Sequence, residues 1–104
     1  MNSRKALIIE NDESYLKLIS GTLAGFGFEN LVVKKGEEAP ELVKQELPDL
    51  IVLAIELPGV NGYIVCKRIK ETEETKGIPL ILISSEAKTE DFEKHRKLRI
   101  KAEE

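Results

Sequence analysis

The sequence predicts an α/β domain in which helices cover both faces of a doubly wound parallel sheet. Two observations carry this prediction. Short apolar runs alternate with segments of helical periodicity along the chain, and such alternation implies right-handed βαβ units. One run, Leu50 to Ala54, is almost continuously apolar and contains β-branched residues. This pattern is typical of a central strand that is buried on both faces.

The first predicted strand covers residues 5–9 (KALII) and leads into a helix. Asp12 is suited to cap this helix, because its carboxylate can accept a hydrogen bond from a first-turn amide that has no intrahelical partner. Apolar residues then recur at helical spacing, namely Tyr15, Leu16, Ile19 and Leu23. Residues 25–27 (GFG) mark the end of the helix.

Residues 31–33 are predicted to form the second strand and residues 36–47 the second helix. Pro40 is compatible with that helix because it lies in the first turn, where the amides have no intrahelical partner. A third helix is expected over residues 63–71, after the central strand, and a fourth strand over residues 80–83.

Turn-forming residues separate the central strand from the third helix. They are Pro58 and Gly59, followed by Asn61 and Gly62, and both pairs are typical of turns. Ligands of open α/β sheets bind at the carboxyl ends of the strands. We therefore expect any chemistry of this domain to take place near Ala54.

Composition excludes several classes of function. A chain of 104 residues can form one domain with a real core. No run approaches the roughly 20 apolar residues that span a bilayer, and the polar start does not read as a signal peptide, so we expect a cytoplasmic protein without membrane insertion. The net charge of −3 argues against nucleic-acid binding. The only cysteine, Cys66, is expected to pack against the sheet.

The stretch from Pro48 to Gly62 (PDLIVLAIELPGVNG) resembles the third strand and following loop of response-regulator receiver domains. The resemblance implies a CheY-like, flavodoxin-like fold with strand order 2-1-3-4-5. In that family the third strand ends on an aspartate that becomes phosphorylated, and Ala54 stands at its position. The segments LAIELPGVNGYIVCKRIK and EKHRKLRIKAEE are most similar to the pseudo-receivers of FrzS-type gliding-motility proteins.

The resemblance covers the whole chain, residues 1–104, as a single domain. The family's fifth strand, with its lysine, and its fifth helix are missing from this sequence. We therefore expect a C-terminally incomplete domain that forms the N-terminal part of a longer protein. The fourth strand would then be a bare apolar edge, which proteins normally cover. One explanation is a truncated or partly ordered chain. The other is that a second copy completes the edge, as a homodimer or by strand exchange.

Aspartyl phosphorylation needs a carboxylate nucleophile, a divalent cation and donors to the phosphate. The resemblance aligns Glu10 and Asn11 with the acidic pair that binds magnesium, and Ser84 with the hydroxyl that contacts the phosphate. Asn11 lacks the charge, and Ala54 supplies no ligand at all. We therefore expect weak or absent Mg²⁺ binding, no other metal site and no cofactor.

Two carboxylates, Glu10 and Glu56, are candidates to replace the missing aspartate. The family role of Glu10 is metal binding, and Glu56 lies past the predicted strand end, where it should point to solvent or to the loop. We favour the interpretation that both are solvated loop charges. Tyr63 could fill the space of a phosphoaspartate, but an amphipathic residue at a helix edge is the simpler interpretation.

A basic cluster lies on or after a last predicted helix, which begins near Thr89 and ends near Leu98. Its members are Lys94, His95, Arg96, Lys97 and Arg99. Such a cluster is either a solvated helix face or a docking surface for an acidic partner.

The sequence thus predicts a non-enzymatic, degenerate receiver of two-component signalling that binds a signalling or motility protein without being phosphorylated. Motility or polarity signalling is the suggested setting. One alternative is a receiver that still responds to phosphate through Glu10 or Glu56. The other is a flavodoxin-like domain that binds a small ligand, although no phosphate-cradling loop supports it.

Overall fold

The structure is a computed structural model that describes residues 4–84. The predicted helix from Thr89 and the basic cluster lie outside these described residues. Among the described helices, none combines the length and apolar character needed to cross a membrane.

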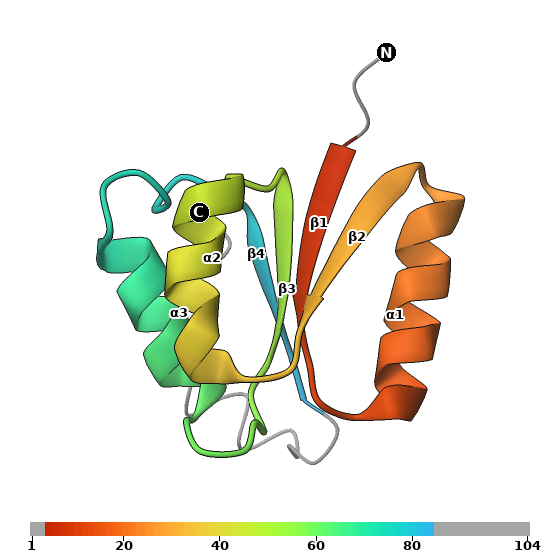
Figure 1. Cartoon of the computed structure of the whole chain (residues 1–104), viewed down its shortest axis with the longest axis horizontal. Coiled ribbons are helices and arrows are strands. Elements are labelled where there is room, and N and C mark those ends of the chain that lie inside the picture. Colours follow the sequence, from red (N-terminus) through yellow and green to blue (C-terminus); the bar gives the residue numbers. More distant parts are fainter. Residues whose placement is uncertain (1–3, 85–104) are drawn as a thin grey trace.

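Four parallel strands form one sheet in the order β2-β1-β3-β4 (Figure 1). β1 (Arg4–Ile9) and β3 (Leu50–Ala54) lie in the centre, with β2 (Phe28–Val33) beside β1 and β4 (Leu80–Ile83) beside β3. The predicted fold class is confirmed, and so is the strand order that the resemblance implied for the first four strands.

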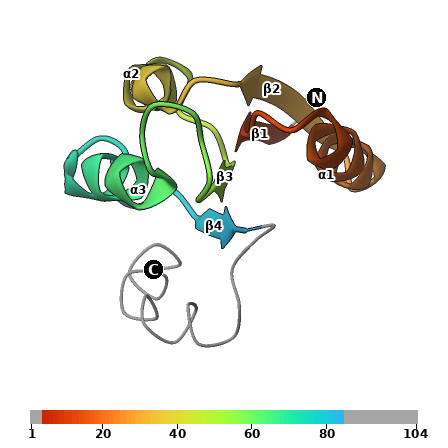
Figure 2. The same ribbon diagram turned by 90° about the horizontal axis from the view of Figure 1, so that it is seen from below.

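Helices cover both faces of this sheet. α1 (Glu13–Gly25) lies on one face, and α2 (Ala39–Glu46) and α3 (Gly62–Glu71) lie together on the other (Figure 2). A short 3-10 turn, η1 (Gly36–Glu38), leads into α2. A helix therefore joins each strand to the next one along the chain, as βαβ units require.

The main core lies between the sheet and the pair α2 and α3. The strands contribute alternate residues to it because successive side chains point to opposite faces. Its residues from the strands, together with Ile55 just after β3, are Leu7, Ile9, Val33, Ile51, Leu53, Leu80 and Leu82. The alternate positions Ala6, Ile8, Val52 and Ala54 are also buried. Burial of both faces explains why the central strands have continuous apolar sequences.

Polar side chains begin two of the helices. Asp12 caps α1 as predicted, since its Oδ1 accepts a hydrogen bond from the Tyr15 amide at 3.0 Å. Asn61 caps α3 in the same way, with its Oδ1 2.7 Å from the Tyr63 amide nitrogen. Such caps satisfy first-turn amides that the helix itself leaves unpaired.

The structure corrects two details of the predicted elements and adds which residues of α1 are buried. β2 begins at Phe28 instead of residue 31, because Arg4 to Ile9 of β1 pair with its whole length. The predicted second helix ends at Glu46, and Leu47 adopts a left-handed conformation (φ 45°) with 55% of its surface exposed. In α1, Tyr15 is 38% exposed and Leu16 is the one buried residue.

Cys66 lies in α3 and packs into the core between this helix and the sheet, as predicted. Burial raises the pKa of its thiol, and the nearby Lys70 ammonium lowers it by a smaller amount. Burial in turn lowers the pKa of Lys70. The Lys70 Nζ donates hydrogen bonds to the carbonyls of Lys76 (3.1 Å) and Ile78 (2.8 Å), and it thereby ties α3 to the segment that enters β4.

Candidate functional site

Three strands bring the predicted site residues to one edge of the sheet. β1 ends next to Glu10, β3 ends on Ala54, and β4 is followed directly by Ser84. Parallel register places them together, since Ile9 pairs with Leu53, and Ala54 pairs with Ile83. This carboxyl edge is where open α/β sheets hold their ligands.

Glu10 is not a solvated loop charge, and that interpretation was wrong. Only 6% of its surface is exposed. Its Oε2 accepts hydrogen bonds from the amides of Asn11 (2.8 Å) and Asp12 (3.1 Å), and its own amide donates to the Val33 carbonyl at 3.1 Å. The carboxylate therefore stabilises the turn from β1 into α1, because it satisfies two amides that the turn leaves without a backbone partner.

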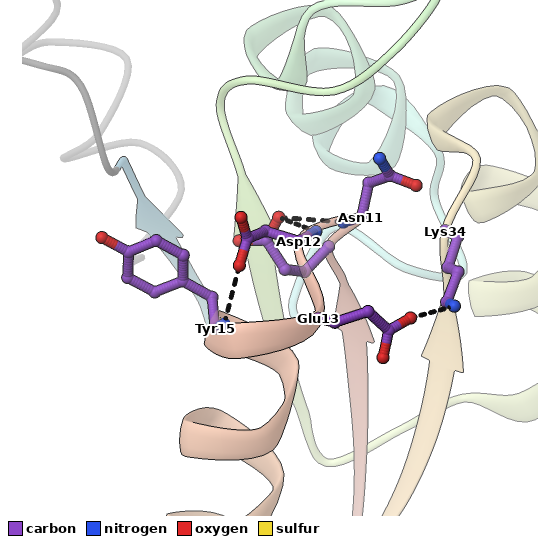
Figure 3. A network of polar contacts seen from close by, with 6 residues as sticks. Asn11, Asp12, Glu13, Tyr15 and Lys34 are labelled. Carbon is purple, nitrogen blue, oxygen red and sulfur yellow. Dashed lines mark hydrogen bonds and ion pairs between the residues drawn. The ribbon is translucent and has the colours of Figure 1, made fainter.

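The turn after β1 carries further charged groups on its solvent side. Asp12 points its carboxylate at the start of α1, and Glu13 forms an ion pair with Lys34 (Figure 3). Asn11 is exposed. Among residues 4–84, no three His, Cys, Asp or Glu side chains are grouped so that they could hold a metal ion.

Ala54 ends β3, and only 3% of its surface is exposed. The chain behind it is tightly folded back, because the Gly62 amide donates to the Ile55 carbonyl at 2.8 Å. A Cβ atom on Gly62 would lie 2.1 Å from the carbonyl oxygen of Ala54. The start of α3 therefore touches the backbone of Ala54 at the end of β3.

Glu56 and Ser84 meet across this edge. The Ser84 Oγ donates a hydrogen bond to the Glu56 Oε2 at 2.5 Å, and both residues are half-buried. Glu56 lies past the end of β3, and its half-exposed carboxylate accepts the Ser84 hydroxyl instead of pointing to solvent alone. Sequence reasoning identified Ser84 but missed its acceptor, because no local pattern links two residues that lie 28 positions apart.

Tyr63 lies in the first turn of α3, where it is half-buried and packs against the main core. This position agrees with the simpler interpretation of Tyr63 as an amphipathic residue at a helix edge.

The fold and the polar residues at its carboxyl edge define a small doubly wound α/β domain with its site at the ends of β1, β3 and β4. The model of the response regulator receiver domain matches residues 6–102, and the chain belongs to that family. It is 34% identical over 94 residues to the polar-differentiation response regulator DivK of Brucella ovis, and the match covers 90% of this chain and 76% of DivK.

Solved structures agree with this assignment. The phosphorylated cyanobacterial phytochrome response regulator RcpA is 28% identical, with a TM-score of 0.80 over 93% of this chain and 76% of RcpA. The BeF3-activated N-terminal receiver domain of Klebsiella pneumoniae RstA is 25% identical, with a TM-score of 0.79 over 91% of this chain and 79% of that domain. The chain is thus a CheY-like receiver of two-component signal transduction, a class of module that is generally non-enzymatic and acts through signalling partners.

Proposed function

We propose that this receiver signals without aspartyl phosphorylation of its own chain and acts as a protein-interaction module, a pseudo-receiver of the FrzS type. The observation that carries the proposal is Ala54. It stands at the end of β3, where the family carries its phosphorylated aspartate, and a methyl group cannot form an acyl phosphate. Covalent catalysis at this position requires a nucleophilic carboxylate.

The two neighbouring carboxylates are poorly suited to replace the aspartate. The Glu10 Oε2 already accepts two backbone hydrogen bonds, and the Glu56 Oε2 accepts the Ser84 hydroxyl. Phosphoryl transfer depends on an in-line nucleophile and on neutralisation of the phosphoryl oxygens. Engagement of both carboxylates within the protein disfavours the alternative in which Glu10 or Glu56 is phosphorylated.

The same edge fits a magnesium ion poorly, so we further propose that Mg²⁺ binding is weak or absent. Magnesium requires hard oxygen ligands in near-octahedral geometry. Ala54 supplies no side-chain oxygen, Asn11 supplies no charge, and one of the two Glu10 carboxylate oxygens, Oε2, already accepts two amides of its own turn. The names of RcpA and RstA describe phosphorylated and beryllofluoride-activated proteins, and that chemistry would need the carboxylate that Ala54 lacks.

The proposed partner is a cytoplasmic signalling protein. DivK is named for polar differentiation, which makes cell polarity or motility the setting that we propose for this chain. A receiver that does not switch by phosphorylation must present its binding surface in another way, either permanently or under the control of the partner.

Treatment with acetyl phosphate tests the proposal. Wild type, Ala54→Asp and Ala54→Asn are incubated with acetyl phosphate and magnesium, and phosphoaspartate is sought by intact mass and by trapping with hydroxylamine. We expect a phosphoryl adduct on Ala54→Asp alone, because asparagine matches aspartate in size but is no nucleophile. An adduct on wild type would refute the proposal, and Glu10→Gln and Glu56→Gln would then locate it.

A further inference from the structure

The hydrogen bond between Ser84 and Glu56 joins the end of β4 to the loop between β3 and α3. Ser84 directly follows β4, and Glu56 lies in the loop between β3 and α3. Their oxygen atoms are 2.5 Å apart, which is within the range of hydroxyl-to-carboxylate hydrogen bonds.

The backbone holds both partners in place. The Ile55 amide donates to the Ile83 carbonyl at 2.8 Å and extends the β3–β4 ladder to the residues next to the pair. The Gly62 amide donates to the Ile55 carbonyl at 2.8 Å and anchors the loop from the other side. Glu56 therefore follows a residue whose amide and carbonyl are both hydrogen-bonded, so the carboxylate reaches Ser84 from a well-defined backbone.

The chemistry of the pair matches that of a phosphorylated receiver in one respect. Ser84 stands at the position of the family hydroxyl that contacts the phosphate, and the phosphate would be attached at the position of Ala54. Here an anionic oxygen near the end of β3 already accepts the hydroxyl. Charge-assisted hydrogen bonds of this kind are about twice as strong as neutral ones.

We infer that Glu56 is a built-in substitute for the phosphoryl group: its carboxylate holds the Ser84 hydroxyl and keeps the end of β4 permanently in one arrangement. The inference rests on the proposed function, since a phosphorylated chain would have no need of a substitute. It adds to that function a constitutive state, in which the arrangement at the end of β4 does not depend on a signal at position 54.

The Ser84 rotamer is the first test. Three-bond couplings between Hα and Hβ of Ser84 are measured by NMR in wild type, Glu56→Ala, Glu56→Gln and the control Glu37→Ala. Glu37 is an exposed carboxylate beside the same loop, since its Oε2 lies 3.5 Å from the Cβ position of Gly59. We expect one rotamer in wild type and in Glu37→Ala, and averaged couplings in Glu56→Ala, with Glu56→Gln between them.

The affinity for beryllofluoride, a phosphoryl mimic, is the second test, and it uses the Ala54→Asp background. Glu56→Ala should strengthen beryllofluoride binding about tenfold, because the mimic no longer competes with a charged acceptor for Ser84. The same substitution in Ala54→Asp/Ser84→Ala should have a much smaller effect. An equal gain in both backgrounds would show simple charge repulsion and would overturn the inference.

The two proposals fail in different ways. The inference that Glu56 substitutes for the phosphoryl group fails if the Ser84 couplings are averaged in wild type, or if Glu56→Ala leaves them unchanged. Neither result bears on the proposal that the chain is not phosphorylated. A phosphoryl adduct on wild-type chain overturns the proposed function, whatever the rotamer of Ser84.

Discussion

Gly62 illustrates how a single residue positions the site. Its amide is hydrogen-bonded to the Ile55 carbonyl, and the space where its side chain would lie is taken by the backbone of Ala54 and Ile55. The sequence predicts a turn at Asn61 and Gly62, which is correct. The φ angle of Gly62 is not in the left-handed region, so backbone conformation does not explain the glycine. The physical reason is the close approach between the start of α3 and the end of β3, which leaves no room for a side chain.

We therefore expect Gly62→Ala to destabilise the domain by about 3 kcal/mol or more, since backbone must move to admit a methyl group. Gly21→Ala is the matched control. Gly21 lies within α1 with no atom within 4 Å of its Cβ position, and alanine there should stabilise the domain by about 0.5 to 1 kcal/mol. Urea unfolding measures both changes. Equal stability of Gly62→Ala and wild type would contradict the close approach.

At the scale of the element, α3 is defined at both ends by polar side chains. Asn61 caps its start. Beyond its end, Thr75 is 99% buried, and its Oγ1 donates to the Ile69 carbonyl at 2.7 Å. The sequence alone assigns no role to Thr75, because no local pattern marks it as buried. The last carbonyl groups of a helix lack intrahelical donors. The Thr75 hydroxyl supplies a donor to one of them.

Thr75→Val tests this role of the hydroxyl. Valine has nearly the same shape, so the substitution removes the hydrogen bond and leaves the buried Ile69 carbonyl poorly satisfied. We expect a loss of about 1 to 3 kcal/mol in the free energy of unfolding. Thr22→Val is the control, because the Thr22 hydroxyl makes a similar bond to the Leu18 carbonyl at 2.8 Å on an exposed surface. A change below about 0.5 kcal/mol is expected there, and an equal loss in both variants would refute the role of burial.

At the scale of the whole molecule, burial is greatest in the two central strands, and we expect stability to be concentrated there. Leu7, Ile8, Ile51 and Leu53 are completely buried, and they belong to β1 and β3, which have a strand on each side. β2 is different, since its residue Val32 is 47% exposed. Buried central strands usually open only when the whole domain unfolds, whereas less buried elements open locally.

Amide hydrogen exchange should reveal this difference. We expect the hydrogen-bonded amides of β1 and β3 to exchange with an opening free energy equal to that of global unfolding in urea. Those of β2 should exchange at least about tenfold faster. As a control, the exchange rates should be proportional to the hydroxide concentration, which shows that they report the equilibrium between closed and open states. Slower exchange in β2 than in β1 would contradict the proposed distribution of stability.

The sequence by itself determined the fold class, the four described strands, the cap at Asp12 and the residue identities at Ala54 and Ser84. These features follow from local information, namely apolar periodicity, helix caps and the amino acid present at each position. Only the tertiary structure decided that Glu10 is buried and that Glu56 accepts the Ser84 hydroxyl. Both outcomes depend on which backbone groups meet when distant strands pair in parallel. That register is set by hydrogen bonds and packing between segments far apart in the chain.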